Sequence, residues 1–192
     1  DEGDIKRILK KVETRGASNQ TLQLYRRLRT LFNYAVTERY LDESPMDRLA
    51  VMGSENEKDR NLSNSEICTF WKALDEIDMR EDIRRALKLI LITAQRPGEV
   101  IGAHSSEFDG DWWTIPAHRA KNRSEHKVFL TQTAKELFNT PDEGFCFPRY
   151  FSTKGDTTPK AIDVNSLSKE LRRILPKVDV ISFTPHDLRR TA

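Results

Sequence analysis

The sequence has few of the features that define several large classes of protein. It contains two cysteines in 192 residues, and neither Cys68 nor Cys146 lies in a CxxC pair or a metal-spaced cluster. A disulfide framework is therefore excluded, and we interpret both residues as reduced, buried thiols of a cytoplasmic protein. No apolar run approaches the length that spans a bilayer, and the first residues do not resemble a signal peptide, so no membrane partner is expected.

Motifs for nucleotide and metal chemistry are also missing. There is no glycine-rich phosphate loop of the Walker type, which disfavours a nucleoside triphosphate, and neither an HExxH motif nor clustered carboxylates indicate a metal. We therefore expect no cofactor and no metal ion. The formal net charge is only +2, so overall charge does not indicate a nucleic-acid partner, and any basic surface must come from local clusters.

Hydrophobic periodicity predicts two domains that are mainly α-helical, with a small antiparallel β-sheet in the second. Residues 1–50 predict a small helical domain with a long helix capped by Ser18 or Asn19, and the polar residues 51–62 predict a linker. The second domain covers residues 63–192. In it we expect helices within 61–77, 80–95, 131–139, 163–178 and 184–192, a hairpin formed by 111–118 and 126–131, and a strand from residue 144.

Two cations in the second domain have unusual positions. Arg96 ends the most apolar segment of the chain, where a charge is costly unless it is paired, and Glu99 has the spacing to hold its guanidinium. The alternative is an ordinary surface arginine at a helix end, where the helix dipole favours cations. Lys121 lies among the cations of the predicted hairpin tip, and the alternative there is a solvated turn.

The last predicted helix brings further cations together. Thr184 and Pro185 fit its first positions, and His186 and Arg189 share one of its faces. Arg189 and Arg190 in a first turn are unfavourable unless an anion compensates them, although a basic helix start without a task is the alternative. Arginine offers a fork for two phosphate oxygens, and lysine or histidine can protonate a leaving oxygen. The best-fitting chemistry is a metal-free, arginine-based site that acts on a phosphodiester.

Three segments carry a resemblance to a known family. "TAQRPGEV", "WTIPAHRAKNRSEHKVFL" and "FTPHDLRRTA", in this order and spacing, resemble the tyrosine recombinases or phage integrases, and most closely those of prophages and genomic islands. The similarity covers residues 59–192, and the first fifty residues resemble the C-terminal part of the helical core-binding domain that precedes the catalytic domain. The resemblance implies site-specific DNA recombination, for integration and excision, through a 3′-phosphotyrosyl intermediate.

The resemblance also implies roles for individual residues. Arg96 is similar to the first catalytic arginine and Glu99 to its structural partner, while Lys121 matches the hairpin lysine that protonates the leaving 5′ oxygen. His186 and Arg189 match the H-x-x-R motif, so these cations would clamp the scissile phosphate. The implied partner is double-stranded DNA carrying attachment sites, bound by a homotetramer of the full-length protein. The fragment itself is expected to be a monomer.

Three departures from the family pattern bear on these expectations. Ala94 stands where many relatives have glycine and Phe129 where many have proline, and both changes are mild. The family's nucleophilic tyrosine follows the H-x-x-R motif, whereas the four tyrosines of this chain, Tyr25, Tyr34, Tyr40 and Tyr150, all precede His186. The 192 residues are therefore expected to bind DNA without cleaving it, although the full-length protein would be an enzyme.

Other functions are compatible with parts of this pattern. A DNA-binding regulator could use the same fold without cleaving, and the presence of a tyrosine beyond residue 192 would discriminate it. A type IB topoisomerase shares the arrangement of Arg, Lys and Tyr, and would relax supercoiled DNA without a defined site. A helical domain with scattered cations would require three coincident motifs.

Overall fold

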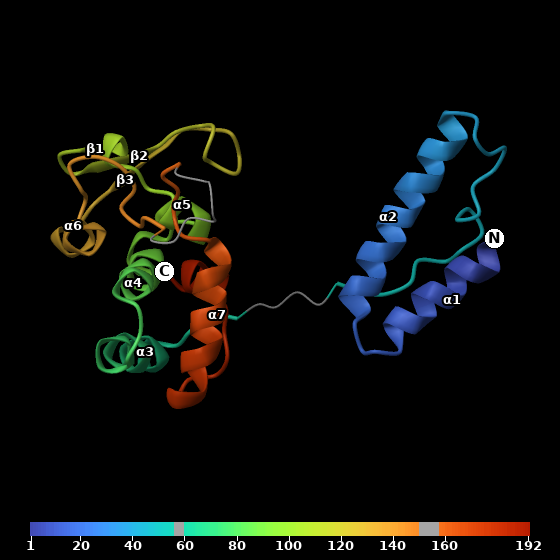
Figure 1. The fold of residues 1–192 in the computed structure, drawn as a ribbon. Helices are drawn as coiled ribbons and strands as arrows, with labels where there is room; N and C mark the ends of the chain where they lie inside the picture. Colours follow the sequence, from blue (N-terminus) through green and yellow to red (C-terminus); the bar gives the residue numbers. More distant parts are fainter. Residues whose placement is uncertain (56–59, 150–157) are drawn as a thin grey trace. The chain divides into compact units, whose positions relative to one another are not determined.

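A computed structural model describes residues 1–55, 60–149 and 158–192. The chain divides into two compact units, Asp1–Asp59 and Arg60–Ala192 (Figure 1). Each unit has a hydrophobic core of its own. Among the described residues, no helix is both long enough and apolar enough to cross a membrane.

The smaller unit is built on two helices, α1 (Glu2–Glu13) and α2 (Ser18–Thr37). Leu9 of α1 and Tyr25 of α2 are buried in its core, and the Tyr25 hydroxyl donates a hydrogen bond to the carbonyl oxygen of Leu49 at 2.9 Å. The predicted cap of α2 is wrong, because the helix begins at Ser18 and no side chain caps it. The Ser18 hydroxyl instead accepts a hydrogen bond from the backbone N–H of Ser54.

The larger unit is organised around one buried helix. Its helices are α3 (Asn64–Glu76), α4 (Glu81–Thr93), α5 (Pro97–Ile101), α6 (Gln132–Phe138), α7 (Val164–Ile174) and α8 (Pro185–Thr191), with 3-10 turns η1 (Ser105–Glu107) and η2 (Leu175–Lys177). Every residue of α4 from Ala86 to Leu91 is buried, and α3, α5, α6, α7 and α8 all pack against it. The predicted central position of this apolar helix is confirmed, because only a helix covered on most sides can bury so much apolar surface.

A three-stranded antiparallel sheet lies at one end of the larger unit, with α3 at the opposite end (Figure 1). The strands are β1 (Phe108–Asp109), β2 (Trp112–Ile115) and β3 (His126–Phe129), in the order β1-β2-β3. Alternation puts Trp113 and Ile115 in the core, where Phe138 of α6 packs on Trp113 with ring centroids 4.9 Å apart. The predicted hairpin and the fold class, mainly α with a small antiparallel sheet, are confirmed.

Two local expectations are wrong. The predicted strand from residue 144 is reduced to isolated bridges of Phe145 with His104 and of Pro148 with Ala161, and residues 150–157 lie outside the described part of the chain. Cys68 is exposed on α3, whereas Cys146 is buried as expected. Burial raises the pKa of the Cys146 thiol to about 11, so this residue stays protonated at neutral pH.

Candidate active site

Arg96 and Glu99 are brought together by a sharp turn after the central helix. α4 ends at Thr93, and its C-cap residue Ala94 has a left-handed φ of 55°; α5 then begins after Arg96, its N-cap residue. The Glu99 carboxylate accepts hydrogen bonds from the Arg96 backbone N–H at 3.0 Å and from its Nη1 at 2.8 Å. The contact expected from the spacing of three residues is therefore present, and the Glu99 carboxylate satisfies the backbone N–H of the N-cap residue as in one half of a capping box.

Arg189 of α8 approaches the same carboxylate from a distant part of the sequence. Its Nη1 lies 3.8 Å from Glu99 Oε2, which is an ion-pair distance without a hydrogen bond. Glu99 is only 3% exposed, while the side chains of Arg96 and Arg189 are 29% and 31% exposed. One buried carboxylate thus holds two guanidinium groups that both reach solvent.

The electrostatics of Glu99 follow from this arrangement. Burial by itself raises the pKa of the carboxyl, but the hydrogen bonds from Arg96 and the charges of Arg96 and Arg189 outweigh it. The pKa therefore lies below its ordinary value of 4.5, and Glu99 is ionised at neutral pH. Arg189 Nη1 is buried and has no hydrogen-bond partner among the described residues. A buried donor of this kind is costly unless a ligand accepts its proton, so the pair has unused capacity for an oxyanion.

The helix that carries His186 and Arg189 begins as predicted. Thr184 is its N-cap and Pro185 occupies the first turn, and Asp187 accepts hydrogen bonds at 2.8 Å from both the backbone N–H and the hydroxyl of Thr184. The expected placement of Arg189 and Arg190 in the first turn is wrong, because they lie in the last turn of α8. Their charge therefore does not need an anion at the helix N-terminus, and Glu99 is what holds Arg189.

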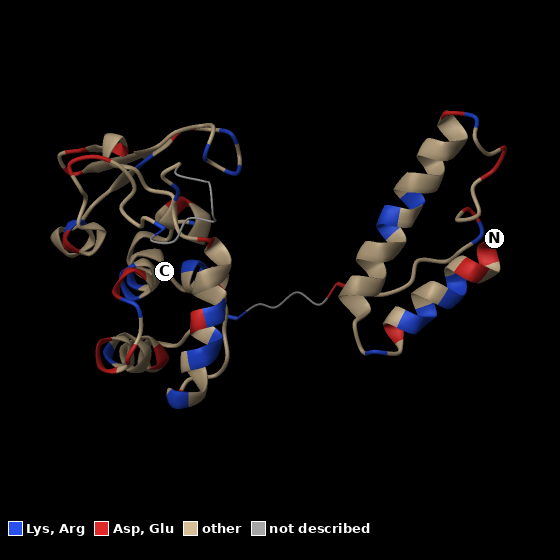
Figure 2. Ribbon diagram, in the orientation of Figure 1, with Lys and Arg blue, Asp and Glu red and all other residues tan. Residues whose placement is uncertain are grey.

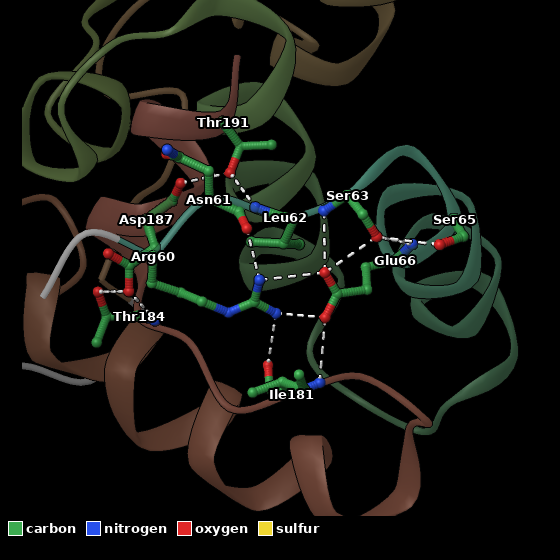
Figure 3. Close-up of polar contacts among 10 residues, drawn as sticks. All are labelled: Arg60, Asn61, Leu62, Ser63, Ser65, Glu66, Ile181, Thr184, Asp187 and Thr191. Atoms are coloured by element: carbon green, nitrogen blue, oxygen red, sulfur yellow. Dashed lines mark hydrogen bonds and ion pairs between the residues drawn. The ribbon is translucent and has the colours of Figure 1, made fainter.

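Residues at the start of the larger unit bind the segment that precedes α8 and the last residue of α8 (Figure 3). Arg60 forms a two-pronged ion pair with Glu66 and donates a hydrogen bond to the carbonyl oxygen of Ile181, in the segment before α8. At the other end, the backbone N–H of Leu62 donates to the hydroxyl of Thr191 at 2.9 Å. The H-x-x-R helix is therefore held by the first residues of its own unit as well as by α4.

His186 and Lys121 are exposed. His186 lies one turn before Arg189 on α8, so the two share a face as predicted. Lys121 lies in the turn between β2 and β3, where Figure 2 shows a concentration of basic residues. Ion pairs join Arg96, Glu99 and Arg189 into one cluster, and His186 lies on α8, the helix that carries Arg189. Among the described residues, no hydrogen bond or ion pair joins Lys121 to that cluster.

Sequence reasoning missed two contacts that fix the hairpin beside the cluster. Arg119, another cation of the predicted hairpin tip, is largely buried in an ion pair with Glu107, which neither interpretation of that tip anticipated. His126, the first residue of β3, shares a hydrogen bond of 2.9 Å with the side chain of Gln95, the residue before Arg96. Neither contact has a spacing that a helix or hairpin pattern could reveal, since the partners are twelve and thirty-one residues apart.

Three of the four tyrosines belong to the smaller unit, and the fourth lies outside the described residues. Tyr25 is buried in the smaller unit, and Tyr34 and Tyr40 are exposed there at 59% and 76%. Tyr150 lies outside the described residues. The described part of the larger unit therefore contributes no phenol to the arginine cluster. Nor do the described residues include a group of three or more His, Cys, Asp or Glu side chains placed to hold a metal ion.

Comparisons with known proteins give one curated relative and several solved structures, while no protein-family model matches the chain. The integrase of enterobacteria phage P4 is 30% identical over 187 residues, covering 85% of this chain and 41% of the relative. The chain therefore spans less than half the length of that relative.

Solved structures share the fold at low sequence identity. A lambda integrase dimer bound to a COC′ core site matches 99% of this chain and 71% of its own, with a TM-score of 0.76 and 16% identity. The Tn1549 transposon integrase in complex with circular intermediate DNA matches 100% of this chain and 70% of its own, with a TM-score of 0.64 and 16% identity.

Proposed function

Because this chain belongs to the integrase family of tyrosine recombinases, we propose that it supplies the DNA-binding and phosphate-clamping part of a site-specific recombinase. The observation that carries the proposal is the Glu99 carboxylate with Arg96 and Arg189 on either side. Such a pair of guanidinium groups, pre-oriented by one buried acid, suits the non-bridging oxygens of a phosphodiester.

Each residue of the site has a role in the proposed reaction. Arg96 and Arg189 hold the scissile phosphate and stabilise the charge that develops on it. A tyrosine oxygen forms a bond to phosphorus, the bond from phosphorus to the 5′ oxygen breaks, and Lys121 gives its proton to that oxygen. The tyrosine's own proton passes to a base, for which His186 is our candidate. Rejoining reverses these steps, so the phosphodiester energy is conserved in the 3′-phosphotyrosyl bond.

The tyrosine of this reaction is not one of the four in the chain. Residues 1–192 should therefore bind double-stranded DNA as a monomer without cleaving it. Cleavage, exchange between attachment sites and assembly of a homotetramer on DNA would belong to the whole gene product, acting on the chromosome in the cytoplasm of a bacterial host. The units Asp1–Asp59 and Arg60–Ala192 correspond in this proposal to a partial core-binding domain and an incomplete catalytic domain.

The direct test is covalent capture of DNA by the whole gene product. The substrate is nicked duplex DNA from the junctions of the genetic element that carries the gene, and the readout is a protein-linked 3′ strand on a denaturing gel. Arg96→Ala and Arg189→Ala should each reduce capture at least about a hundredfold, as loss of a charge-stabilising donor does. Arg172→Ala, an exposed arginine of α7, is the matched control and should leave capture unchanged.

Other outcomes would replace the proposal. Binding without capture by a gene product that has no tyrosine after residue 192 would favour a non-catalytic regulator. Relaxation of a supercoiled plasmid that lacks the junction sequence would favour a type IB topoisomerase. Capture by residues 1–192 alone would refute the assignment of the nucleophile to a later tyrosine.

A further inference from the structure

Arg119 is the most heavily bonded cation of the turn between β2 and β3. Its Nε and Nη2 donate to the two carboxylate oxygens of Glu107 at 2.7 and 2.6 Å, and its Nη1 donates to the carbonyl oxygen of Glu99 at 3.1 Å. The side chain of Arg119 is 18% exposed and that of Glu107 is 8% exposed. A guanidinium that donates from three nitrogens in fixed directions holds neighbouring segments in place and is not a freely solvated charge.

Two neighbouring residues, Trp113 and Gly102, favour this position of the Arg119 side chain. Trp113 of β2, itself fully buried, donates its indole N–H to Glu107 at 2.9 Å and so fixes the carboxylate. Gly102, directly after α5, leaves the space for the guanidinium, because a Cβ at that position would lie 2.6 Å from Arg119 Nη1. The sheet, through Trp113 and Glu107, and the end of α5, at Gly102, therefore both help to fix the Arg119 side chain of the turn.

Arg119 links the turn that carries Lys121 directly to Glu99, in addition to the hydrogen bond of His126 with Gln95 beside Arg96. Arg119 binds the backbone of Glu99, whose side chain holds Arg96 and Arg189. Two residues further along the chain, Lys121 is exposed in the turn. The residue between them, Ala120, is buried, and its N–H donates to the carbonyl oxygen of Pro116 at 3.1 Å. Arg119 and Ala120 thus anchor the turn, and Lys121, the next residue, is exposed to solvent.

We propose that Arg119 is a positioning residue that sets the distance of Lys121 from the arginine cluster and thereby the protonation of the leaving 5′ oxygen. This inference rests on the proposed function. Proton transfer requires hydrogen-bond reach of the leaving oxygen, so a turn that moves by about 1 Å loses much of the effect of its acid. Arg119 itself touches neither the phosphate nor the leaving oxygen in this scheme.

The test compares two substrates that differ in one atom. In the first, the leaving group is the ordinary 5′ oxygen; in the second, a 5′-bridging sulfur replaces it. A thiol has a pKa of about 8.5, so a thiolate leaves without being protonated and the second substrate needs no acid. Arg119→Lys keeps the charge but loses the fork, and Arg123→Lys in the same turn, at an exposed residue, is the matched control. All variants are made in the whole gene product, and single-turnover cleavage rates are measured.

We expect Arg119→Lys to cleave the oxygen substrate about 10 to 100 times more slowly than wild type, given the 10²–10⁴-fold contribution of a general acid. On the sulfur substrate its rate should match wild type within about threefold, as should that of Lys121→Ala. Gly102→Ala, which displaces the guanidinium without removing it, should behave like Arg119→Lys. Arg123→Lys should match wild type on both substrates.

Three results would overturn the inference. Equal slowing on both substrates would mean that Arg119 only supports the fold, and wild-type rates on both would mean that it has no effect on Lys121. If wild type cleaves neither substrate, the proposed function fails and this inference fails with it. Arg96→Ala, which removes part of the phosphate clamp, should cleave both substrates slowly. Arg119→Lys should cleave only the oxygen substrate slowly, so the two variants distinguish loss of the clamp from loss of acid positioning.

Discussion

Replacing Glu99 by glutamine tests the carboxylate on which the arginine cluster depends. Glu99→Gln keeps the size of the side chain but removes the negative charge shared by Arg96 and Arg189. Removing one partner of a buried ion pair costs about 3–5 kcal/mol, and because both arginines are about one third exposed, water recovers part of that cost. We expect a loss of about 2–3 kcal/mol in the free energy of unfolding of residues 60–192.

For a domain of this size, each kcal/mol lowers Tm by about 3–5 °C, so the expected decrease is about 6–15 °C at pH 7. The measurement is thermal unfolding followed by circular dichroism or calorimetry. Glu136→Gln, at an exposed position on α6, is the control and should change stability by less than about 0.5 kcal/mol.

The pH dependence gives the sharper test. The folded pKa of Glu99 lies below its ordinary value of 4.5, so its contribution to stability is fully present above pH 4.5 and is lost as the pH falls through the folded pKa. The difference in the free energy of unfolding between wild type and Glu99→Gln should therefore be constant from pH 7 to about pH 5 and should decrease below that pH. A loss no larger than that of Glu136→Gln, or a difference that does not change down to pH 3, would refute the reasoning.

Four further substitutions test the fold. Gly53→Ala should destabilise only the smaller unit, by more than about 1 kcal/mol, because φ at Gly53 is 85° and a Cβ would lie 2.4 Å from a backbone oxygen; hydrogen exchange should rise in residues 1–55 alone. Phe138→Ala should cost about 3–5 kcal/mol in urea unfolding, since its ring is fully buried. Ala94→Gly should raise stability by about 0.5–1 kcal/mol, because its φ of 55° suits glycine, and an unchanged Tm would contradict this. Glu66→Gln should lower Tm at pH 7 and converge with wild type as the pH falls toward 2, because hydrogen bonds from Arg60 and Ser63 lower the Glu66 pKa to about 2.

Signals confined to a few neighbouring residues were predictable from the sequence. Thr184 and Pro185 predict a helix start because the N-cap and the fixed φ of proline both act within one turn. The contact of Arg96 with Glu99 follows in the same way from a spacing of three residues. The buried helix α4 was predictable from apolar residues on most of its sides, and the β2–β3 hairpin from two short runs of β-formers on either side of a polar segment.

Contacts between distant segments were not predictable, for a physical reason. The residues around Arg119 in the sequence are polar and charged, which is typical of a solvated turn. Arg119 is largely buried only because Glu107 lies beside it in the folded structure and forms an ion pair with it. The run Phe145 to Phe147 has the composition of a strand, but its tertiary partners supply only isolated bridges. In both cases the local pattern is satisfied by more than one structure, and packing decides among them.

Glu99 contacts the three arginines Arg96, Arg119 and Arg189. Its side chain holds Arg96 and Arg189, and its backbone carbonyl holds Arg119, so a five-residue helix determines the position of three cations from three segments. The helix can do so because α5 packs against the buried α4 and because Glu99 is itself almost inaccessible. The side chain and the carbonyl of Glu99 bind different partners, so their effects can be separated. Glu99→Gln weakens the hold on Arg96 and Arg189 and leaves the carbonyl bond to Arg119, whereas Arg119→Lys weakens that bond and leaves the contacts of Glu99 with Arg96 and Arg189. In the reaction that we propose, positioning of the phosphate and positioning of the acid would therefore be distinct properties of one residue.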